Sequence, residues 1–420
     1  MAFLIILVLT SALTAPFARA QTGVATIPVT GTPQTLAYDP GKGEVFVVNL
    51  GPKGSVLSDA SNAVVATLAL PSGSIPLEAA YDQAKGENFV ADSGNAEVSV
   101  ISDSTNKVVA NVGVGGTPDG VAYDPAKGEV FVANGLDDTL SVISDTTNSV
   151  VATVTLPTGS SPEGLAYDAA KGEVFVADNG GDNVSVVSDS TNLVTANVAI
   201  FGSPTSLAYD SGKGEVFVNS FGDGFAVISD STNSVVTYVP LPAGGSVGAI
   251  AYDPARGDVI AGSYMSNTIS AVSDSTNKIV ANVTVGKAPY DVAYDSGKGE
   301  LFVANSGNSS ISVVPNAALS TTTSGTTTTS SSSSSSVSST SVVSSVSLSS
   351  TSSATSTPFT TSSGLSTTPT SSSGGGGGVP EFPYQLLVAA AFTLLIAISY
   401  LLVRRNGTSA GLRQGTLAAA

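Results

Sequence analysis

The stretch PDGVAYDPAKGEVFVANGLDDTLSVISDTTNSVVATV, residues 118–154, decides the fold. It contains four short apolar runs separated by turns rich in Gly, Asn, Asp and Ser: Gly120 to Tyr123, Glu129 to Ala133, Leu140 to Ile143 and Val150 to Val154. Runs of four to six residues with alternating apolar side chains predict antiparallel β-strands. No stretch before the C-terminal region has the length or the 3.6-residue period of a helix, so the sequence predicts an all-β domain.

The same unit recurs along the chain, and a Tyr-Asp pair marks each copy. Subtracting residue numbers shows that successive tyrosines are 42 to 44 residues apart. Four strands in each of seven units of this length predict a seven-bladed β-propeller of four-stranded blades. The marking tyrosines are Tyr38, Tyr81, Tyr123, Tyr167, Tyr209, Tyr252 and Tyr294.

The two ends of the repeat region predict how the ring closes. The seventh unit has three strand-like runs, and then Pro315-Asn316 interrupts the chain where a fourth should follow. A strand of the missing type occurs at the other end, from Val24 to Val29. We therefore expect the N-terminal strand to complete the last blade, which leaves no open sheet edge in the ring.

The repeat resembles a known family. Phe131-Val-Ala-Asn134, followed by Leu140 to Asp145 and by Val150 to Val154, is similar to the YVTN-type β-propeller repeats of prokaryotic surface proteins. The eponymous tyrosine is phenylalanine in most blades, and the sixth repeat reads Val259 to Gly262 at this place. Phenylalanine fills the same apolar position, so the resemblance implies the same fold. WD40 repeats fit poorly, because the chain has no tryptophan.

Composition excludes several kinds of chemistry. The chain has no cysteine and no histidine, which rules out disulfides, thiolate or imidazole metal sites and histidine-dependent catalytic triads. Thirty-two Asp and Glu stand against 15 Lys and Arg, a formal net charge of −17. Phosphate binding requires a basic surface, so we expect no nucleic-acid partner. An acidic surface instead favours solubility and association with cations.

The segments outside the repeats predict a protein of the cell surface. We expect a signal peptide over residues 1–20, the propeller over 21–316, a disordered Ser/Thr/Gly-rich stalk over 317–379, a membrane anchor over 380–403 and a cytoplasmic tail over 404–420. An apolar run followed by Ala18-Arg19-Ala20 is typical of a cleaved leader, with an uncleaved N-terminal anchor as the alternative. The stalk composition cannot bury a core and would suit glycosylation, so we expect a glycoprotein.

The C-terminal segment predicts a single membrane crossing with the propeller outside the cell. Residues 384–403 form 20 consecutive residues without a charge, enough for a helix of about 30 Å across a bilayer. Arg404 and Arg405 follow at once and predict a cytoplasmic C-terminus. The preceding Val379 to Pro383 resembles signals processed by sortase-like enzymes of the exosortase type, although about 15 residues follow the arginines; a plain anchor is the alternative that we favour.

Function is expected where the seven blades differ. The turns that carry Lys-Gly and Ser-Asp-x-x-Asn recur in nearly every blade and lie on one face of the ring, so they predict a structural role. On the opposite face, the loop before each first strand varies after its proline, and four blades place a carboxylate there. The candidate ligand-binding or cation-binding residues are Glu78, Asp119, Glu163 and Asp291, with Asp137, Asp138, Asp182 and Asp223 in adjacent loops, and with Tyr290 as a stacking residue.

Three interpretations of this acidic rim remain open. Convergent oxygen ligands could hold a hard cation such as Ca²⁺, or they could receive a cationic or polyhydroxylated ligand. The third interpretation is a solvated acidic rim without a ligand. No EF-hand spacing marks a calcium loop, and we predict no other cofactor.

Two classes of function follow. The first is a binding, adhesion or envelope-structural module on a stalk, which would contact an extracellular protein or glycan. The second is an extracytoplasmic lyase or hydrolase that acts on polysaccharide through rim carboxylates, with or without Ca²⁺. Nothing in the sequence marks a catalytic pair, so the sequence favours the first class and predicts no catalytic residue.

Overall fold

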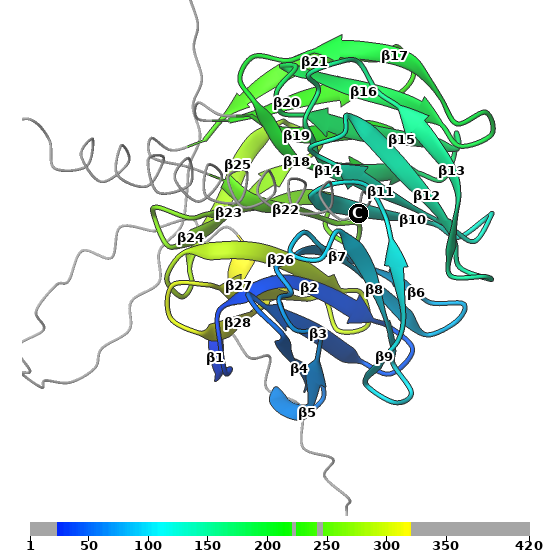
Figure 1. The fold of residues 1–420 in the computed structure, drawn as a ribbon. Helices are drawn as coiled ribbons and strands as arrows, with labels where there is room; N and C mark the ends of the chain where they lie inside the picture. The colour runs from blue at the N-terminus through cyan, green and yellow to red at the C-terminus, as the bar shows by residue number, and fades with distance from the viewer. Residues whose placement is uncertain (1–22, 221–223, 242–246, 321–420) are drawn as a thin grey trace, which may run out of the picture. The chain divides into compact units, whose positions relative to one another are not determined.

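The computed structural model describes residues 23–220, 224–241 and 247–320. Its strands form seven four-stranded antiparallel sheets that follow one another around a ring, from blue to yellow (Figure 1). The chain is a seven-bladed β-propeller. The expected signal peptide, nearly all of the expected stalk and the expected membrane helix over residues 384–403 lie outside the described residues. Within the described part of the chain, no helix is long and apolar enough to cross a membrane.

In blades 1 to 6 the four strands are paired in sequence order, with the first strand nearest the ring axis. Blade 1 contains β2 (Pro33–Asp39), β3 (Glu44–Asn49), β4 (Lys53–Ser58) and β5 (Ala63–Ala69). Blade 2 contains β6 (Pro76–Asp82), β7 (Glu87–Asp92), β8 (Glu97–Ser102) and β9 (Lys107–Gly113). Blade 3 contains β10 (Pro118–Asp124), β11 (Glu129–Asn134), β12 (Thr139–Ser144) and β13 (Ser149–Thr155).

The remaining blades repeat this order. Blade 4 contains β14 (Pro162–Asp168), β15 (Glu173–Asp178), β16 (Asn183–Ser188) and β17 (Leu193–Ala199). Blade 5 contains β18 (Pro204–Asp210), β19 (Glu215–Ser220), β20 (Gly224–Ser229) and β21 (Ser234–Pro240). Blade 6 contains β22 (Val247–Asp253), β23 (Asp258–Ser263), β24 (Thr268–Ser273) and β25 (Lys278–Thr284). Blade 7 contains β26 (Pro289–Asp295), β27 (Glu300–Asn305), β28 (Ser310–Pro315) and β1 (Ala25–Pro28).

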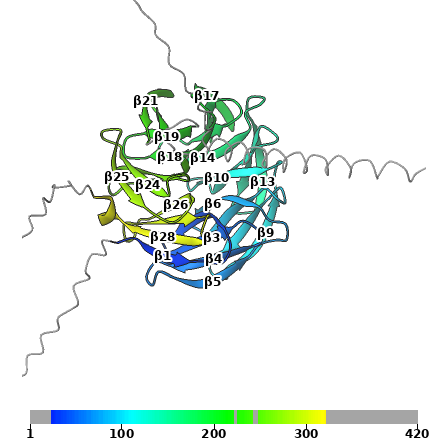
Figure 2. The same cartoon turned by 90° about the vertical axis from the view of Figure 1, so that its left-hand side faces the viewer.

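The N-terminal strand closes the ring, as predicted. β1 pairs antiparallel with β28, with Ile27 opposite Ile311, so the two ends of the propeller sequence share one sheet (Figure 2). Ile27 is 5% exposed and packs in a cluster with residues of blades 7 and 1, such as Leu36 and Phe302. The first strands of neighbouring blades contact one another around the ring, including β26 with β2. The strand therefore removes an open edge and covers apolar surface at once.

The core lies between neighbouring blades. The phenylalanine of each second strand is fully buried in six blades, and Ile260 takes its place in blade 6. In the cluster between blades 3 and 4, Phe131 and Val142 of one blade pack with Leu165 and Val176 of the next. One blade alone could not cover these side chains, so the ring folds by stacking blades on each other.

The Tyr-Asp pairs hold the turns on one side of the ring, which we call the turn face. In blade 3, Asp124 Oδ1 accepts the Ala126 N–H at 2.8 Å, and the Tyr123 hydroxyl donates to Asp145 Oδ2 at 3.1 Å. Gly128 has φ 65°, and a Cβ there would lie 2.6 Å from Asp145 Oδ2. The Asp145 N–H donates to the Gly128 carbonyl at 2.9 Å, which joins the first and third turns of the blade. The repeated motif is thus a turn lock, and the glycine is sterically required.

The folded part of the chain extends past the expected boundary at residue 316. A short 3-10 helix, η1 (Asn316–Leu319), follows β28. Leu319 is fully buried and belongs to an apolar cluster with residues of blades 6 and 7. The expected stalk composition therefore begins only after this docked turn, because a leucine among small polar residues still finds an apolar pocket to fill.

Candidate functional site

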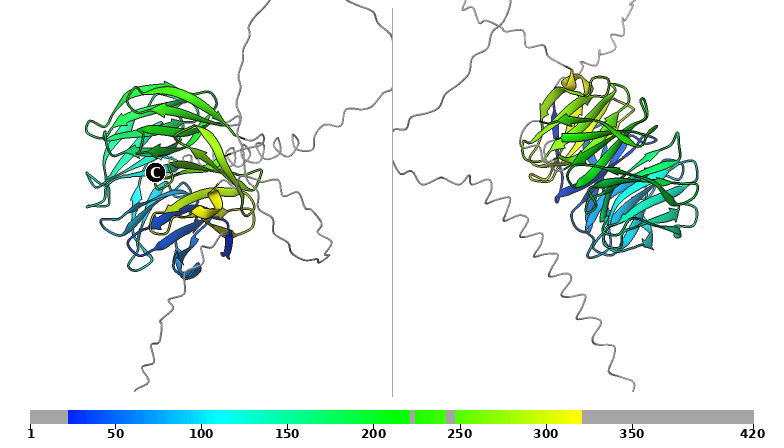
Figure 3. Two further views of the ribbon diagram at one scale, coloured as in Figure 1. Left: turned by 180° about the vertical axis from the view of Figure 1, so that it is seen from behind. Right: turned by 90° about the horizontal axis from the view of Figure 1, so that it is seen from above.

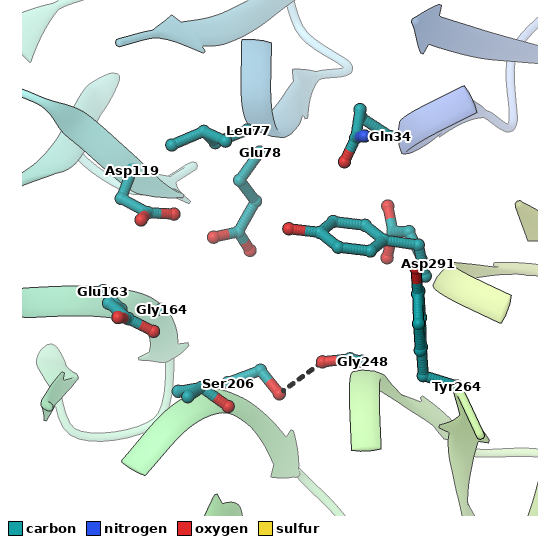
Figure 4. A pocket seen from close by; sticks show the side chains of 12 residues that line it. Gln34, Leu77, Glu78, Asp119, Glu163, Gly164, Ser206, Gly248, Tyr264 and Asp291 are labelled. Atoms are coloured by element: carbon teal, nitrogen blue, oxygen red, sulfur yellow. Dashed lines mark hydrogen bonds between the residues drawn. The ribbon is translucent and has the colours of Figure 1, made fainter. Parts of the chain in front are cut away.

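The ring face opposite the turn face carries the variable loops and has a cavity at its centre, which we call the mouth. In every blade except blade 6, the first strand begins with proline. The two residues after this proline face the ring axis or the neighbouring blade. The mouth has a volume of about 350 Å³. It is lined by Gln34, Leu77, Glu78, Asp119, Glu163, Gly164, Thr205, Ser206, Gly248, Tyr264, Tyr290 and Asp291 (Figure 4).

Two carboxylates from neighbouring blades form an acidic wall of the mouth. Asp119 lies on β10 and Glu163 on β14, and each is followed by a glycine. A Cβ on Gly120 would lie 2.2 Å from the Glu163 carbonyl oxygen, so only glycine lets the two strands approach this closely. The Asp-Gly and Glu-Gly pairs therefore narrow the ring at the place where they present a carboxylate.

The environment of these two carboxyl groups favours their neutral forms. Burial raises the pKa of Asp119 to about 6. Burial and then the charge of Asp119 raise the pKa of Glu163 to about 8. Both side chains keep some exposed area, yet protein atoms surround them on the inside of the ring, so desolvation dominates both shifts. A cation bound between the two groups would act in the opposite direction and favour their ionised forms.

Glu78 and Asp291 occupy equivalent positions and reach the next blade. Asp291 Oδ2 accepts the Leu36 N–H at 2.7 Å, and Oδ1 accepts the Val292 N–H at 2.7 Å. Burial and then the charges of Asp291 and Asp119 raise the pKa of Glu78 well above its usual range, although the nearby Val121 N–H acts in the opposite direction. Burial also raises the pKa of Asp291, although its hydrogen bonds to Leu36 and Val292 act in the opposite direction. Asp291 is thus largely occupied as a clip between blades 7 and 1.

Two tyrosines form the wall across from the acids. Tyr264 follows β23 of blade 6, and Tyr290 lies on β26 of blade 7 with 36% of its surface exposed. Burial and then the negative charges of Asp119 and Glu163 raise the pKa of the Tyr290 phenol. The two walls of the mouth are therefore close enough to interact electrostatically. In Figure 4, Glu78 and Asp119 point into the cavity, and Tyr264 lies on its other side. The mouth is therefore asymmetric: Glu78, Asp119 and Glu163 of blades 2 to 4 lie on one side, and the two rings of blades 6 and 7 lie on the other, where Asp291 is the one carboxylate among the lining residues and is held by backbone N–H groups.

Polar groups complete the lining without adding a positive charge. The Ser206 hydroxyl donates to the Gly248 carbonyl at 3.2 Å (Figure 4). This hydrogen bond joins the neighbouring blades 5 and 6 in the wall of the mouth. Gln34 and Thr205 add an amide and a hydroxyl. The twelve lining residues include no lysine and no arginine. This lining suits a ligand that brings its own positive charge and one flat or apolar face.

The structure separates the predicted rim residues into two groups. Glu78, Asp119, Glu163, Tyr290 and Asp291 line the mouth, whereas Asp137, Asp138 and Asp182 do not. Asp137 Oδ2 accepts the Gly116 N–H at 2.6 Å. Asp138 accepts the Gly159 and Ser161 N–H groups at 2.7 and 2.9 Å, and these bonds lower the pKa of Asp138.

These two aspartates cap the loops between blades, so backbone N–H groups outside the mouth occupy their carboxylates. Asp182 is exposed and does not line the mouth either. Asp223 lies outside the described residues.

A Ca²⁺ site at the rim was one of the predicted interpretations, but the described part of the chain contains no complete set of ligands for it. There, no group of three or more acidic, histidine or cysteine side chains is placed to hold a metal ion. Asp119 and Glu163 would offer two carboxylates, fewer than the six to eight oxygen ligands that Ca²⁺ takes. A bound Ca²⁺ would have to take its other ligands from water or from a second ligand.

Sequence reasoning did not identify Tyr264. It lies directly after the second strand of its blade, where the other blades carry residues as different as Leu50, Gly135 and Ser306. A lone tyrosine in a variable loop gives no periodic signal, and only the packing of blade 6 on blade 7 brings this loop close to β26. An alignment of the seven loops by position would have shown it as one of the aromatic exceptions.

Comparisons with known proteins support the fold and go no further. No family model matches the sequence, and no curated protein matches it. Among solved structures, the hydrazine synthase of Kuenenia stuttgartiensis aligns with a TM-score of 0.60 and 15% sequence identity. The alignment covers 68% of this chain and 95% of that chain. At this identity the likeness shows the propeller fold alone.

Proposed function

We propose that this protein is a cell-surface binding module of the YVTN-like propeller type. The rigid ring would be displayed outside the cell on the Ser/Thr-rich stalk, with residues 380–403 as the membrane anchor and the C-terminus in the cytoplasm. Its ligand, an extracellular glycan or protein, would bind in the mouth. The leader-like N-terminus, the stalk composition and the Arg404-Arg405 pair support this location.

The observation that carries the proposed binding function is the asymmetry of the mouth. Asp119 and Glu163 present carboxylates without a basic partner in the lining, and Tyr264 and Tyr290 present aromatic rings opposite them. An amine placed between these walls would neutralise the carboxylates and face the electron-rich rings, an arrangement worth about 0.5–2 kcal/mol for each cation–π contact. We therefore propose a ligand that carries a protonated amine on a ring or chain with an apolar face.

The matched pair of chitosan and chitin oligosaccharides tests this function. They differ by the acetyl group that removes the positive charge, so the full-length protein should bind the amine form more tightly by ten-fold or more in calorimetry. The paired substitutions Asp119→Asn and Glu163→Gln should abolish this preference. Asp182→Asn is the control, because Asp182 is acidic and exposed but lies outside the mouth.

Equal binding of the two sugars by the wild type, or an unchanged preference in the double variant, would refute a cationic ligand in the mouth. Binding of lysine-rich peptides but not of amino sugars would keep the cationic class and would identify a protein partner instead.

One observation favours a second candidate function, an extracytoplasmic enzyme acting on polysaccharide. Two carboxyl groups on adjacent blades with pKa values of about 6 and about 8 resemble a pair in which one group donates and the other accepts a proton. Release of reducing ends from an amino-polysaccharide, lost in Glu163→Gln, would support the enzyme. Saturable binding without any product over hours would leave the binding module as the function.

A further inference from the structure

Neighbouring blades are joined on the turn face by a repeated ion pair. The lysine of one blade's first turn reaches the aspartate in the third turn of the next blade, with N–O distances from 2.9 to 3.9 Å. The six pairs are Lys42–Asp103, Lys85–Asp145, Lys127–Asp189, Lys171–Asp230, Lys213–Asp274 and Lys298–Asp59. They cover every junction of the ring except the one between blades 6 and 7.

At that seventh junction three residues depart from the repeat together. Arg256 replaces the lysine of the other blades, and Asp258 replaces the glutamate that starts the second strand. Asn316 stands where the third-turn aspartate would be, because the chain leaves the ring after β28. Three coordinated changes at one point of an otherwise regular sequence indicate a dedicated local structure.

Arg256 uses its whole guanidinium group to hold the departing chain. Nε donates to Asp258 Oδ2 at 2.8 Å, which orients the group. Nη1 donates to the Asn316 carbonyl at 3.3 Å, and Nη2 donates to the Leu319 carbonyl at 3.1 Å. A planar fork can serve three acceptors at once, whereas the point charge of a lysine ammonium cannot reproduce this geometry.

Leu319 provides the apolar half of the same joint. It is fully buried in a cluster that includes Ile260 and Ile269 of blade 6, and Leu301 and Val314 of blade 7. η1 also contacts β25, the outer strand of blade 6 (Figure 3). The last described residues of the chain are therefore fastened to blade 6, although their own strand belongs to blade 7.

We propose that Arg256, Asp258 and Leu319 form an exit clasp, which passes tension from the chain beyond residue 320 into blade 6. β28 is held on one side by β27 and on the other by β1, which is only four residues long. Tension applied directly at the end of β28 would open its hydrogen bonds one after another. The clasp takes up this tension before it reaches β28, so the ring stays closed when the chain beyond it is pulled, a role that rests on the membrane anchoring proposed above.

Hydrogen exchange on the full-length protein tests the clasp. Arg256→Lys restores the residue that six other blades carry, so the ring should still fold, but the clasp loses its contacts with the two carbonyls. We expect the amides of residues 316–320 to exchange at least ten-fold faster, with no change in blades 2 to 4. Lys127→Arg, the reverse change at the junction of blades 3 and 4, is the matched control and should leave residues 316–320 unaffected.

A pulling experiment gives the second readout. With the protein held at an N-terminal tag and pulled from its C-terminus in an optical trap, Arg256→Lys and Leu319→Ala should each lower the force of the first rupture. Lys127→Arg should not lower it. Unchanged exchange at residues 316–320 in Arg256→Lys, or the same first rupture force in the wild type and both clasp variants, would overturn the proposal. Ligand binding in the mouth is not part of either readout, so failure here is distinct from failure of the proposed binding function.

Discussion

The turn face and the mouth are built from the same repeats but use them in opposite ways. On the turn face, tyrosine, aspartate, lysine and glycine recur at the same positions and make the same contacts, as in Tyr123 with Asp145 and Tyr167 with Asp189. At the mouth, equivalent positions hold Gln34, Asp119 and Tyr290. Repetition thus stabilises the ring, and variation around one axis produces an asymmetric cavity.

The turn face and the mouth also differ in whether their carboxylates have positively charged neighbours. On the turn face each carboxylate of the third turn has a lysine within reach and a tyrosine hydroxyl beside it, as Asp145 has Lys85 and Tyr123. At the mouth, Asp119 and Glu163 share a cavity whose lining has no basic residue. Charge that is neutralised by its neighbours serves the fold, whereas charge left without a counter-ion is available to a ligand.

The largest effect is expected from breaking the ring that both faces share. Deletion of residues 21–30 removes β1 and uncovers the apolar surface around Ile27. Loss of a buried isoleucine costs about 2–5 kcal/mol, and loss of the strand's hydrogen bonds adds to it. We expect chemical denaturation to show that the free energy of unfolding falls by at least about 3 kcal/mol. Deletion of residues 331–340 from the Ser/Thr-rich run is the control, and an unchanged midpoint in the β1 deletion would contradict closure through this strand.

A smaller change, which raises the free energy of unfolding, is expected at a core position of blade 2 where the residue departs from the repeat. Asn88 is fully buried at a position where five other blades have valine and one has leucine. Among the described residues, neither side-chain atom of Asn88 has a hydrogen-bond partner. An unpaired buried amide costs about 1–3 kcal/mol, so Asn88→Val should raise the unfolding free energy by about that amount.

Val130→Asn is the matched control, because it places the same amide at the equivalent site of blade 3 and should destabilise the protein. A loss of stability in Asn88→Val would show instead that Asn88 makes a favourable contact, for example with a buried water.

The smallest effect concerns the mouth, where the acids influence stability through pH. Glu163 has a pKa of about 8 in the folded protein, above its usual 4.5. The folded state therefore binds more protons than the unfolded state between these values, and the contribution of Glu163 to stability is lost as pH rises through about 8. The melting temperature of the wild type should fall more steeply than that of Glu163→Gln from pH 5 to pH 8, by at least about 2 °C, the shift that about 1 kcal/mol produces in a protein of this size.

Glu129→Gln, which removes a carboxyl group on the turn face beside Lys127, is the variant with which the melting temperatures of Glu163→Gln are compared over the same pH range. Parallel pH profiles for the wild type and Glu163→Gln would show that Glu163 is already ionised at neutral pH and would weaken the case for a proton-coupled mouth.

Much of the fold could be predicted because the signal is periodic. Alternating apolar residues and turn residues define each strand, and successive marking tyrosines from Tyr38 to Tyr294 are all 42 to 44 residues apart. The closing strand was also predictable, because blade 7 lacks a strand and the N-terminus has one to spare. The end of the domain was less predictable, since the burial of Leu319 depends on a pocket that exists only after blades 6 and 7 have packed.

The candidate site was predictable in part, and the reason is geometric. Aligning the blades by tyrosine identified Asp119 and Glu163, because first-strand residues face the axis in every blade. It could not separate them from Asp137 and Asp138, which lie in loops whose carboxylates turn back to cap neighbouring backbone N–H groups. Tyr264 was missed because loop residues follow no period.

The sequence by itself determined the number of blades, the strands of each blade and the strand that closes the ring, because local pattern and turn chemistry act over a few residues and repeat in every unit. Only the tertiary structure decided which variable residues share one cavity and which face the loops outside it. It also decided that Arg256, Asp258 and Leu319 meet at a single joint. Such contacts join residues of different blades, and the pattern within one repeat carries no information about which side chains of another blade will pack against it.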